Sequence, residues 1–136
     1  MPLLIWNDKF SVEIEEFDSQ HKRLITLVNE LHEAMMKGKA EDSLHRVLHE
    51  LVGYTKTHFA AEERFMQTHR FGGYLAHKAE HDKLTKQVVD FQREFREGKI
   101  ALSISLLNFL KTWLTEHIMG TDKKYSICAA PQTLSR

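Results

Sequence analysis

Four long stretches of this sequence carry apolar side chains in alternating steps of three and four residues, and this spacing limits the fold more than any other feature. Such steps keep the side chains on one side of a helix. The 136 residues include only six glycines and two prolines, so few breaks interrupt these stretches. No segment alternates apolar and polar residues between turn residues, as a half-buried strand would. The pattern therefore predicts an all-α protein.

The breaks divide the chain into an arm, four helices and a tail. Asp18 is expected to cap the first helix, Gly38 to end it and Ser103 to cap the fourth. Four such helices with short connections are typical of an up-down-up-down antiparallel four-helix bundle. We predict a single domain over 1–136, with an irregular N-terminal arm at 1–17, helices at about 18–37, 42–68, 74–96 and 103–119, and a short C-terminal turn and tail at 120–136.

The balance of charges argues against some functions. Lys and Arg together number 19, as do Asp and Glu, so no basic excess is present to neutralise nucleic acid. No apolar run approaches the roughly 18 residues that a membrane helix needs. Cys128 is the only cysteine, so it cannot form an internal disulfide. We expect a cytoplasmic protein with no membrane segment and no nucleic-acid partner.

Histidine is the unusual component, with nine residues. Several histidines and a glutamate occupy seam positions beside leucine and phenylalanine. Burying such groups without partners costs free energy, and a metal ion is the partner that suits many of them at once. These seam residues are His21, His58, Glu62, His77, His81 and His117.

The same residues fall at one level of the predicted bundle. His21 and His77 lie near the starts of their helices, whereas His58 and His117 lie near the ends. Because neighbouring helices are antiparallel, the start of one lies level with the end of the next. Residues four apart also stack on one face, about 6 Å from each other. Two pairs have this spacing, His58 with Glu62 and His77 with His81.

Asp122 would join this layer only if the fourth helix is irregular. It follows His117 by five residues, so an ideal helix would rotate it about 140° away. Gly120 lies between the two. We infer a kink, a π-bulge or local unwinding that turns Asp122 inward.

Four motifs, in this order, resemble the signature of the hemerythrin family. Each motif alone is weak, but the four together are specific, and the agreement extends from Trp6 to Tyr125. The chain is most similar to a bacterial single-domain hemerythrin. Glu13 and Phe17 depart from the smaller or aliphatic residues of many relatives, but they leave the motifs intact. The motifs are D-x-x-H at 18–21, H-F-x-x-E at 58–62, H-x-x-x-H at 77–81 and W-L-x-x-H-I-x-x-x-D at 113–122.

The resemblance implies two iron ions, Fe2+ or Fe3+, joined by an oxo or hydroxo bridge. The ligands that the family provides hold one iron with three histidines and the other with two. Counting these ligands leaves one coordination position open for O2, on the iron held by two histidines. Neutral imidazoles outnumber carboxylates, which favours reversible O2 binding over oxidation of a substrate. By resemblance, one iron would be held by His77, His81 and His117 and the other by His21 and His58, with Glu62 and Asp122 bridging both.

The implied function is reversible binding of O2 for storage, transport or delivery, without enzymatic activity. An unidentified O2-accepting protein is a candidate partner. Sensing of O2, redox state or nitric oxide is an alternative, as are a di-iron oxidase or peroxidase and a zinc or mixed-metal structural site. Resemblance and helical proximity to the ligands place an O2 pocket among Leu24, Phe59, Trp113, Leu114 and Ile118.

The other four histidines are not expected to join the site. His45 and His49 are also four residues apart, but in a continuous helix His49 points about 180° from His58, so we expect both at the surface. His32 is expected at the edge of the seam. A cationic His69 would suit the helix dipole at its C-terminal end. The role of Tyr125 is open.

Overall fold

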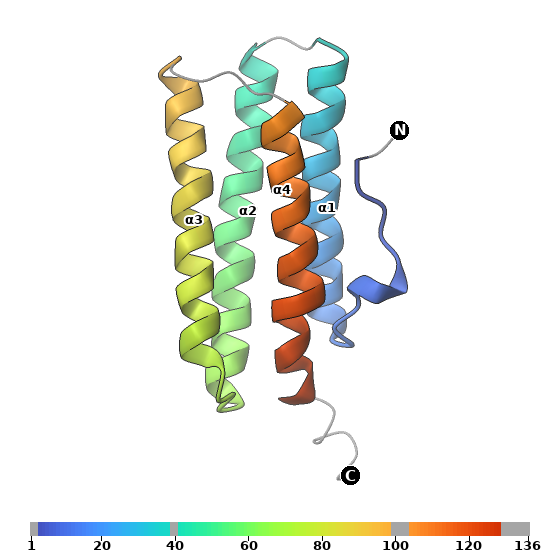
Figure 1. Cartoon of the computed structure of the whole chain (residues 1–136), viewed down its shortest axis with the longest axis vertical. Coiled ribbons are helices and arrows are strands. Elements are labelled where there is room, and N and C mark those ends of the chain that lie inside the picture. Colours follow the sequence, from blue (N-terminus) through green and yellow to red (C-terminus); the bar gives the residue numbers. More distant parts are fainter. Residues whose placement is uncertain (1–2, 39–40, 99–103, 129–136) are drawn as a thin grey trace.

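Four helices run alternately up and down in the computed structural model and form an antiparallel bundle (Figure 1). The structure describes residues 3–38, 41–98 and 104–128. No strand occurs within these ranges, so the all-α prediction is confirmed. None of the helices in them is long and apolar enough to cross a membrane. The helices are α1 (Glu15–Met36), α2 (Glu41–Thr68), α3 (Tyr74–Arg96) and α4 (Ile104–Glu116).

Three shorter helical segments complete the fold. The 3-10 turn η1 (Asp8–Phe10) lies on the N-terminal arm. A π-helical turn, η2 (His117–Thr121), continues α4 directly, and the 3-10 segment η3 (Asp122–Cys128) follows it. The α-helical part of the fourth helix therefore ends at Glu116, earlier than expected from the sequence.

The first helix begins at Glu15, and the prediction that Asp18 caps it is wrong. Ile14 occupies the N-cap position and makes no side-chain cap hydrogen bond. The Asp18 carboxylate instead accepts hydrogen bonds from the Ser11 hydroxyl at 2.6 Å and the Val12 N–H at 2.8 Å. Acidic residues fill the first turn, which suits the positive end of the helix dipole, so the helix starts without a side-chain cap.

Glycines end two of the helices. Gly38 follows α1 with φ 65° and Gly98 follows α3 with φ 76°, a left-handed conformation that glycine adopts without steric cost. The prediction that Gly38 ends the first helix is confirmed. The predicted cap at Ser103 lies outside the described residues.

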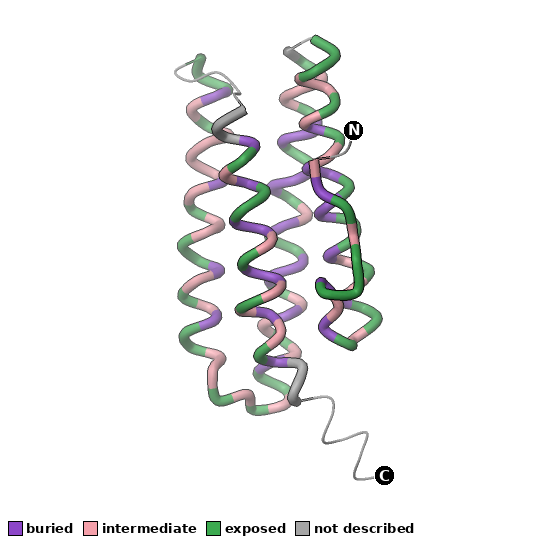
Figure 2. Tube along the Cα trace, turned by 45° about the vertical axis from the view of Figure 1, so that its right-hand side comes forward, coloured by how far each residue is buried: buried purple, intermediate pink, exposed green. Residues whose placement is uncertain are grey.

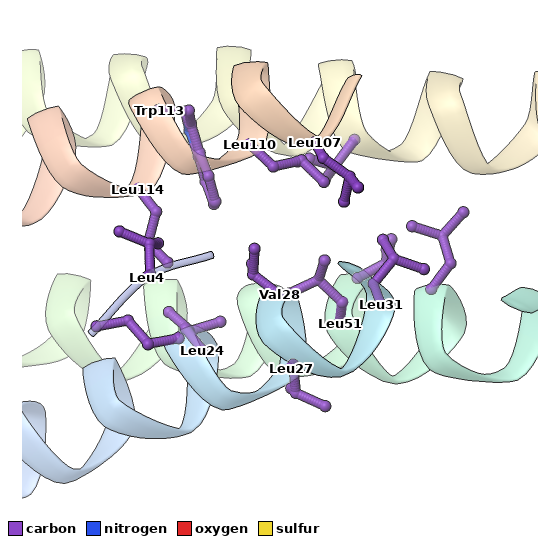
Figure 3. Packing of buried hydrophobic residues seen from close by; sticks show 14 of the residues in the cluster. Leu4, Leu24, Leu27, Val28, Leu31, Leu51, Leu107, Leu110, Trp113 and Leu114 are labelled. Carbon is purple, nitrogen blue, oxygen red and sulfur yellow. The ribbon is translucent and has the colours of Figure 1, made fainter. Parts of the chain in front are cut away.

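Buried residues recur along each helix and alternate with exposed ones (Figure 2). Figure 3 shows Leu24 and Val28 of α1 and Leu114 of α4 pointing into the space between these two helices. They belong to a large apolar cluster that fills the bundle. A smaller cluster, which includes Phe17 and Tyr125, packs at the other end. Along α1, His21 falls between Phe17 and Leu24, so a polar layer separates the two clusters.

The N-terminal arm is fastened along the bundle. Asn29 of α1 accepts a hydrogen bond from the Leu4 N–H at 2.9 Å and donates one to the Leu4 carbonyl at 2.7 Å. Trp6 stacks on Phe10 with ring centroids 5.6 Å apart, and the Lys22 ammonium lies 5.0 Å from the Trp6 ring. The turn η1 packs against η2. The arm therefore connects α1 to the end of the fourth helix.

Replacing Asn29 with Ala should release the arm and lower the free energy of unfolding by about 1–3 kcal/mol, because both polar groups of Leu4 lose their partner. Chemical denaturation monitored by circular dichroism measures this difference. Thr26→Ala is the matched control, because the exposed Thr26 hydroxyl only bonds the Lys22 carbonyl within the same helix. Equal stability of the Asn29 variant and the parent would show that the clamp does not hold the arm.

Candidate metal centre

All seven side chains that the sequence singled out converge in the polar layer of the bundle. Each is nearly inaccessible to solvent, with exposed fractions from 0 to 3%. They come from the first three helices and from the two segments that follow α4. His21 lies on α1, His58 and Glu62 on α2, His77 and His81 on α3, His117 on η2 and Asp122 at the start of η3.

The π-helical turn η2 brings Asp122 into the layer. The Asp122 N–H donates to the His117 carbonyl, so this turn contains one residue more than an α-helical turn. Residues five apart consequently lie on the same face, and Asp122 Oδ1 is 2.9 Å from His117 Nε2. The spacing of the two residues predicted a kink, a π-bulge or local unwinding, and the structure has the π-bulge.

Glu62 lies between histidines from three helices. Its Oε2 is 3.2 Å from Nε2 of both His21 and His58, and its Oε1 is 3.2 Å from His81 Nε2. The Glu62 carboxylate therefore contacts α1, α2 and α3 at once.

Asp122 likewise contacts three histidines. Its Oδ1 is 2.8 Å from His77 Nε2 and 2.9 Å from His117 Nε2, and its Oδ2 is 3.0 Å from His21 Nε2. Each carboxylate thus uses its two oxygens toward different histidines.

The potential ligand atoms form two overlapping sets, and the atoms of each set lie within 4.8 Å of one another. Both sets contain the same two carboxylates. The three-histidine set consists of Glu62, His77, His81, His117 and Asp122, and the two-histidine set consists of His21, His58, Glu62 and Asp122.

Three of the histidines also donate a hydrogen bond away from the centre. When Nδ1–H donates outward, a neutral imidazole presents the lone pair of Nε2 to the centre, which is the form that binds metals. His81 Nε2 and His117 Nε2 are only 3.0 Å apart, so a proton or a cation must separate their lone pairs. The outward pairs are His81 Nδ1 with Glu63 Oε2 at 2.8 Å, His117 Nδ1 with Glu80 Oε1 at 2.8 Å, and His58 Nδ1 with Gln20 Oε1.

Several buried polar atoms of the layer make no hydrogen bond of favourable geometry within the described residues, although a nitrogen or oxygen of the layer lies within 3.2 Å of each. They include His58 Nε2, Glu62 Oε1 and Asp122 Oδ2, which lie within the two sets. Leaving such atoms unsatisfied in an apolar interior is costly, and cations coordinated by them would remove that cost. Imidazole and carboxylate together suit iron and other first-row transition metals. The donor set therefore fits metal ions.

The two carboxylates make the layer strongly attractive to positive charge. Burial lowers the pKa of His21 and His117, but the adjacent Asp122 and Glu62 carboxylates outweigh burial. The pKa rises to about 9 for His21 and to about 10 for His117. A cation bound between the carboxylates would be stabilised by the same attraction.

The histidines in turn keep both carboxylates ionised. Burial raises the pKa of Glu62, but His58 and its neighbours lower it well below the usual value. Burial and the Glu62 charge raise the pKa of Asp122, whereas His117 and His21 outweigh them and lower it to about 2. The layer therefore contains two negative charges that are fully buried.

Tyr125, whose role the sequence left open, contacts this layer directly. Its buried hydroxyl donates a hydrogen bond to Glu62 Oε2, and its ring stacks on His77 with centroids 5.6 Å apart. Burial and the charges of Glu62 and Asp122 raise the pKa of Tyr125, so the phenol stays protonated and acts as a donor. No local spacing signals this contact, because Tyr125 follows the irregular η2 turn.

The apolar residues proposed to line an O2 pocket are all buried. Phe59 stacks on His81 with centroids 3.8 Å apart and planes 3° apart, and it is farther from its helical neighbour His58, at 6.0 Å. Trp113 stacks on His117 at 6.5 Å. The two aromatic residues thus contact the three-histidine set. The exposed fractions of Leu24, Phe59, Trp113, Leu114 and Ile118 range from 0 to 6%.

The remaining histidines lie away from this layer. His49 is exposed and accepts a hydrogen bond from Gln92 Nε2 at 3.3 Å, as expected for a surface residue. His45 is half-buried, because its ring stacks on Phe95 at 4.2 Å. His32 is half-buried on α1. His69 donates its Nδ1–H to the carbonyl of residue 65 at 2.9 Å, near the C-terminal end of α2.

Comparison with known proteins agrees with this arrangement. Residues 12–126 match the family model described as "Hemerythrin HHE cation binding domain". A bacteriohemerythrin of Methylococcus capsulatus is 34% identical over 129 residues, which cover 94% of this chain and 98% of the relative. A bacteriohemerythrin of Stenotrophomonas maltophilia is 35% identical over 126 residues, covering 93% of this chain and 81% of the relative.

Solved structures of hemerythrin have the same fold. The crystal structure of a wild-type hemerythrin superposes with a TM-score of 0.88 at 34% identity, covering 93% of this chain and 97% of the other. A hemerythrin carrying one substitution gives a TM-score of 0.90 at 33% identity, covering 94% and 98% of the two chains. The family match spans the helices that carry all seven converging side chains. This chain therefore belongs to the hemerythrin family.

Proposed function

We propose that this protein binds O2 reversibly at a pair of iron ions and stores, transports or delivers it. Membership of the hemerythrin family supports this function. The observation that carries it is that the three-histidine and two-histidine sets share both carboxylates. Two cations in these sets would therefore be bridged and close enough to act together. Iron ions held there, with an oxo or hydroxo bridge, would supply the electrons for O2 binding.

The two sets support the division of residues between the two irons that the family resemblance implies. His77, His81 and His117 would hold one iron, and His21 and His58 the other. The two-histidine iron has fewer protein ligands and would be the position at which O2 binds. Glu62 and Asp122 would bridge the pair.

The apolar residues beside the layer would keep water from the site. Such exclusion of water matters because the apolar shell around a metal site controls solvent access and the dielectric, and with them the redox behaviour of the metal. The Phe59 and Trp113 rings stack on histidines of the three-histidine set, and leucines of α1 and α4 belong to the same apolar cluster. The proposed wall consists of Leu24, Phe59, Trp113, Leu114 and Ile118, whose burial supports this role. A cytoplasmic location and a protein that accepts the O2 are part of the same proposal.

Anaerobic loading with Fe2+ should give two irons per chain, and the reduced protein should then bind O2, release it under argon and repeat this over several cycles. Metal analysis gives the ratio and optical spectra follow the cycles. The expected ratio follows from the two sets that share their carboxylates. A reproducible ratio of one would contradict the bridging roles. Sustained O2 consumption in proportion to added reductant would indicate an oxidase instead.

The second histidine pair provides a control for the metal ligands. His49→Gln combined with His45→Gln should leave the iron content and optical spectrum unchanged, because neither ring lies in the polar layer. His77→Gln should lose iron, since it removes one of the three histidines of its set. Loss of metal from the double variant with full retention in the His77 variant would refute the proposed ligands.

Leu114→Ala should accelerate the loss of O2-binding capacity during storage in air, because a shortened side chain opens a path for water toward His117. Leu114 and Leu110 are equally buried, with exposed fractions of 1 and 2%. Both truncations should cost roughly 2–5 kcal/mol of stability. Only Leu114 lies one helical turn from His117, so only its loss should shorten the active lifetime markedly. Equal acceleration in both variants would attribute the effect to general loosening of the core.

A further inference from the structure

The histidines of the two sets differ in the charge of the groups that hold them from outside. In the three-histidine set, His81 and His117 each donate to a carboxylate, that of Glu63 or Glu80, and both distances are 2.8 Å. In the two-histidine set, neither histidine has a charged outer partner within the described residues. His58 donates to the neutral amide of Gln20, and His21 Nδ1 has no hydrogen-bond partner within the described residues.

The residues that accept these outer hydrogen bonds, here called the outer residues, are Gln20, Glu63 and Glu80. They occupy corresponding positions around the bundle. Each is the chain neighbour of a residue in the layer but bonds a histidine of the next helix. Gln20 of α1 bonds His58 of α2, Glu63 of α2 bonds His81 of α3, and Glu80 of α3 bonds His117 of η2, which continues α4. The same geometry therefore recurs at three helix pairs, and only the chemical nature of the acceptor changes.

The outer carboxylates are held in place for this role. The Thr121 hydroxyl donates to both oxygens of Glu80, at 3.1 Å each. Glu63 is only partly accessible, with 18% of its side chain exposed, and the Lys78 ammonium lies 3.9 Å from it. Lys78 offsets part of the Glu63 charge, and water partly screens both Lys78 and Glu80, whose side chains are 40% and 39% exposed.

A carboxylate that accepts the outer N–H of a histidine makes the inner nitrogen a stronger metal ligand, and its negative charge favours a cation nearby. An amide orients the ring in the same way but adds no charge. We propose that Glu63 and Glu80 are positioning residues that strengthen cation binding in the three-histidine set, while Gln20 keeps the two-histidine set weaker. This inference rests on the proposed two-cation centre. Under this proposal, the three-histidine set holds its ion firmly and the two-histidine set beside it holds its ion more loosely.

The exchange of glutamate and glutamine tests the charge without removing the hydrogen bond, because the glutamine carbonyl oxygen still accepts the N–H. Cobalt(II) is a suitable cation, since its visible absorption follows binding and calorimetry gives the affinity of each step. The parent protein should bind two Co2+ in two steps. His58→Gln should retain the tighter step and His77→Gln should lose it, which assigns that step to the three-histidine set.

Glu63→Gln with Glu80→Gln should weaken the tighter step by roughly 10–100-fold and leave the weaker step nearly unchanged. Gln20→Glu should instead strengthen the weaker step by about tenfold. A purely structural role would not predict this gain. Glu116→Gln, which removes the charge of an exposed glutamate near His117, is the matched control and should change neither step.

The outcomes separate this inference from the proposed function. Fewer than two Co2+ bound by the parent protein would contradict the two-cation centre itself. Two bound Co2+ with affinities that the Glu63, Glu80 and Gln20 variants leave unchanged would overturn only the role of the outer charges. Equal weakening of both steps in the double variant would also overturn it. Circular dichroism of each variant establishes that the bundle is intact.

Discussion

The bundle is organised around two carboxylates buried among five imidazoles. Glu62 and Asp122 have no accessible surface, and each lies within 3.2 Å of at least three histidine nitrogens. A layer of this composition is unfavourable inside a protein unless positive charge joins it. The apolar clusters on both sides of the layer hold the ligands in place by excluding water. In metal-free protein, protons would have to supply that charge, which is why the pKa of His21 and that of His117 are raised.

The irregular segments of the fold position or cover residues of this layer. The π-helical turn η2 supplies the extra residue that lets both His117 and Asp122 face inward. The N-terminal arm then covers this end of the bundle, since η1 packs on η2 and Asn29 holds Leu4. Tyr125, in the 3-10 segment after the π-helical turn, reaches back to Glu62. Departures from ideal helix are thus concentrated where the fourth helix meets the polar layer.

Much of the site could be predicted, because the period of a helix relates the interval between two residues in the sequence to the directions in which their side chains point. The i, i+4 pairs and their depth in antiparallel helices were sufficient to place His21, His58, His77 and His117 at one level. By its five-residue spacing alone, Asp122 would point about 140° away from His117 in an ideal helix. The family resemblance implied its place in the layer, which in turn required a local change of helix geometry. Asp18 was misread as a cap, because a capping preference is local. Its carboxylate is used instead by the Ser11 hydroxyl and the Val12 N–H, which the turn of the arm brings to it.

The sequence alone determined the helical bundle, the layer of histidines and carboxylates, and the need for a break before Asp122. These properties depend on the number of residues between side chains of the same helix, and the sequence gives that number directly. Only the tertiary structure decided which outer residue supports which histidine. Glu63, Glu80 and Gln20 each stand beside a residue of the layer in the chain, yet each bonds a histidine on the next helix. Such pairings depend on how neighbouring helices are rotated against each other, and packing of the whole core sets that rotation.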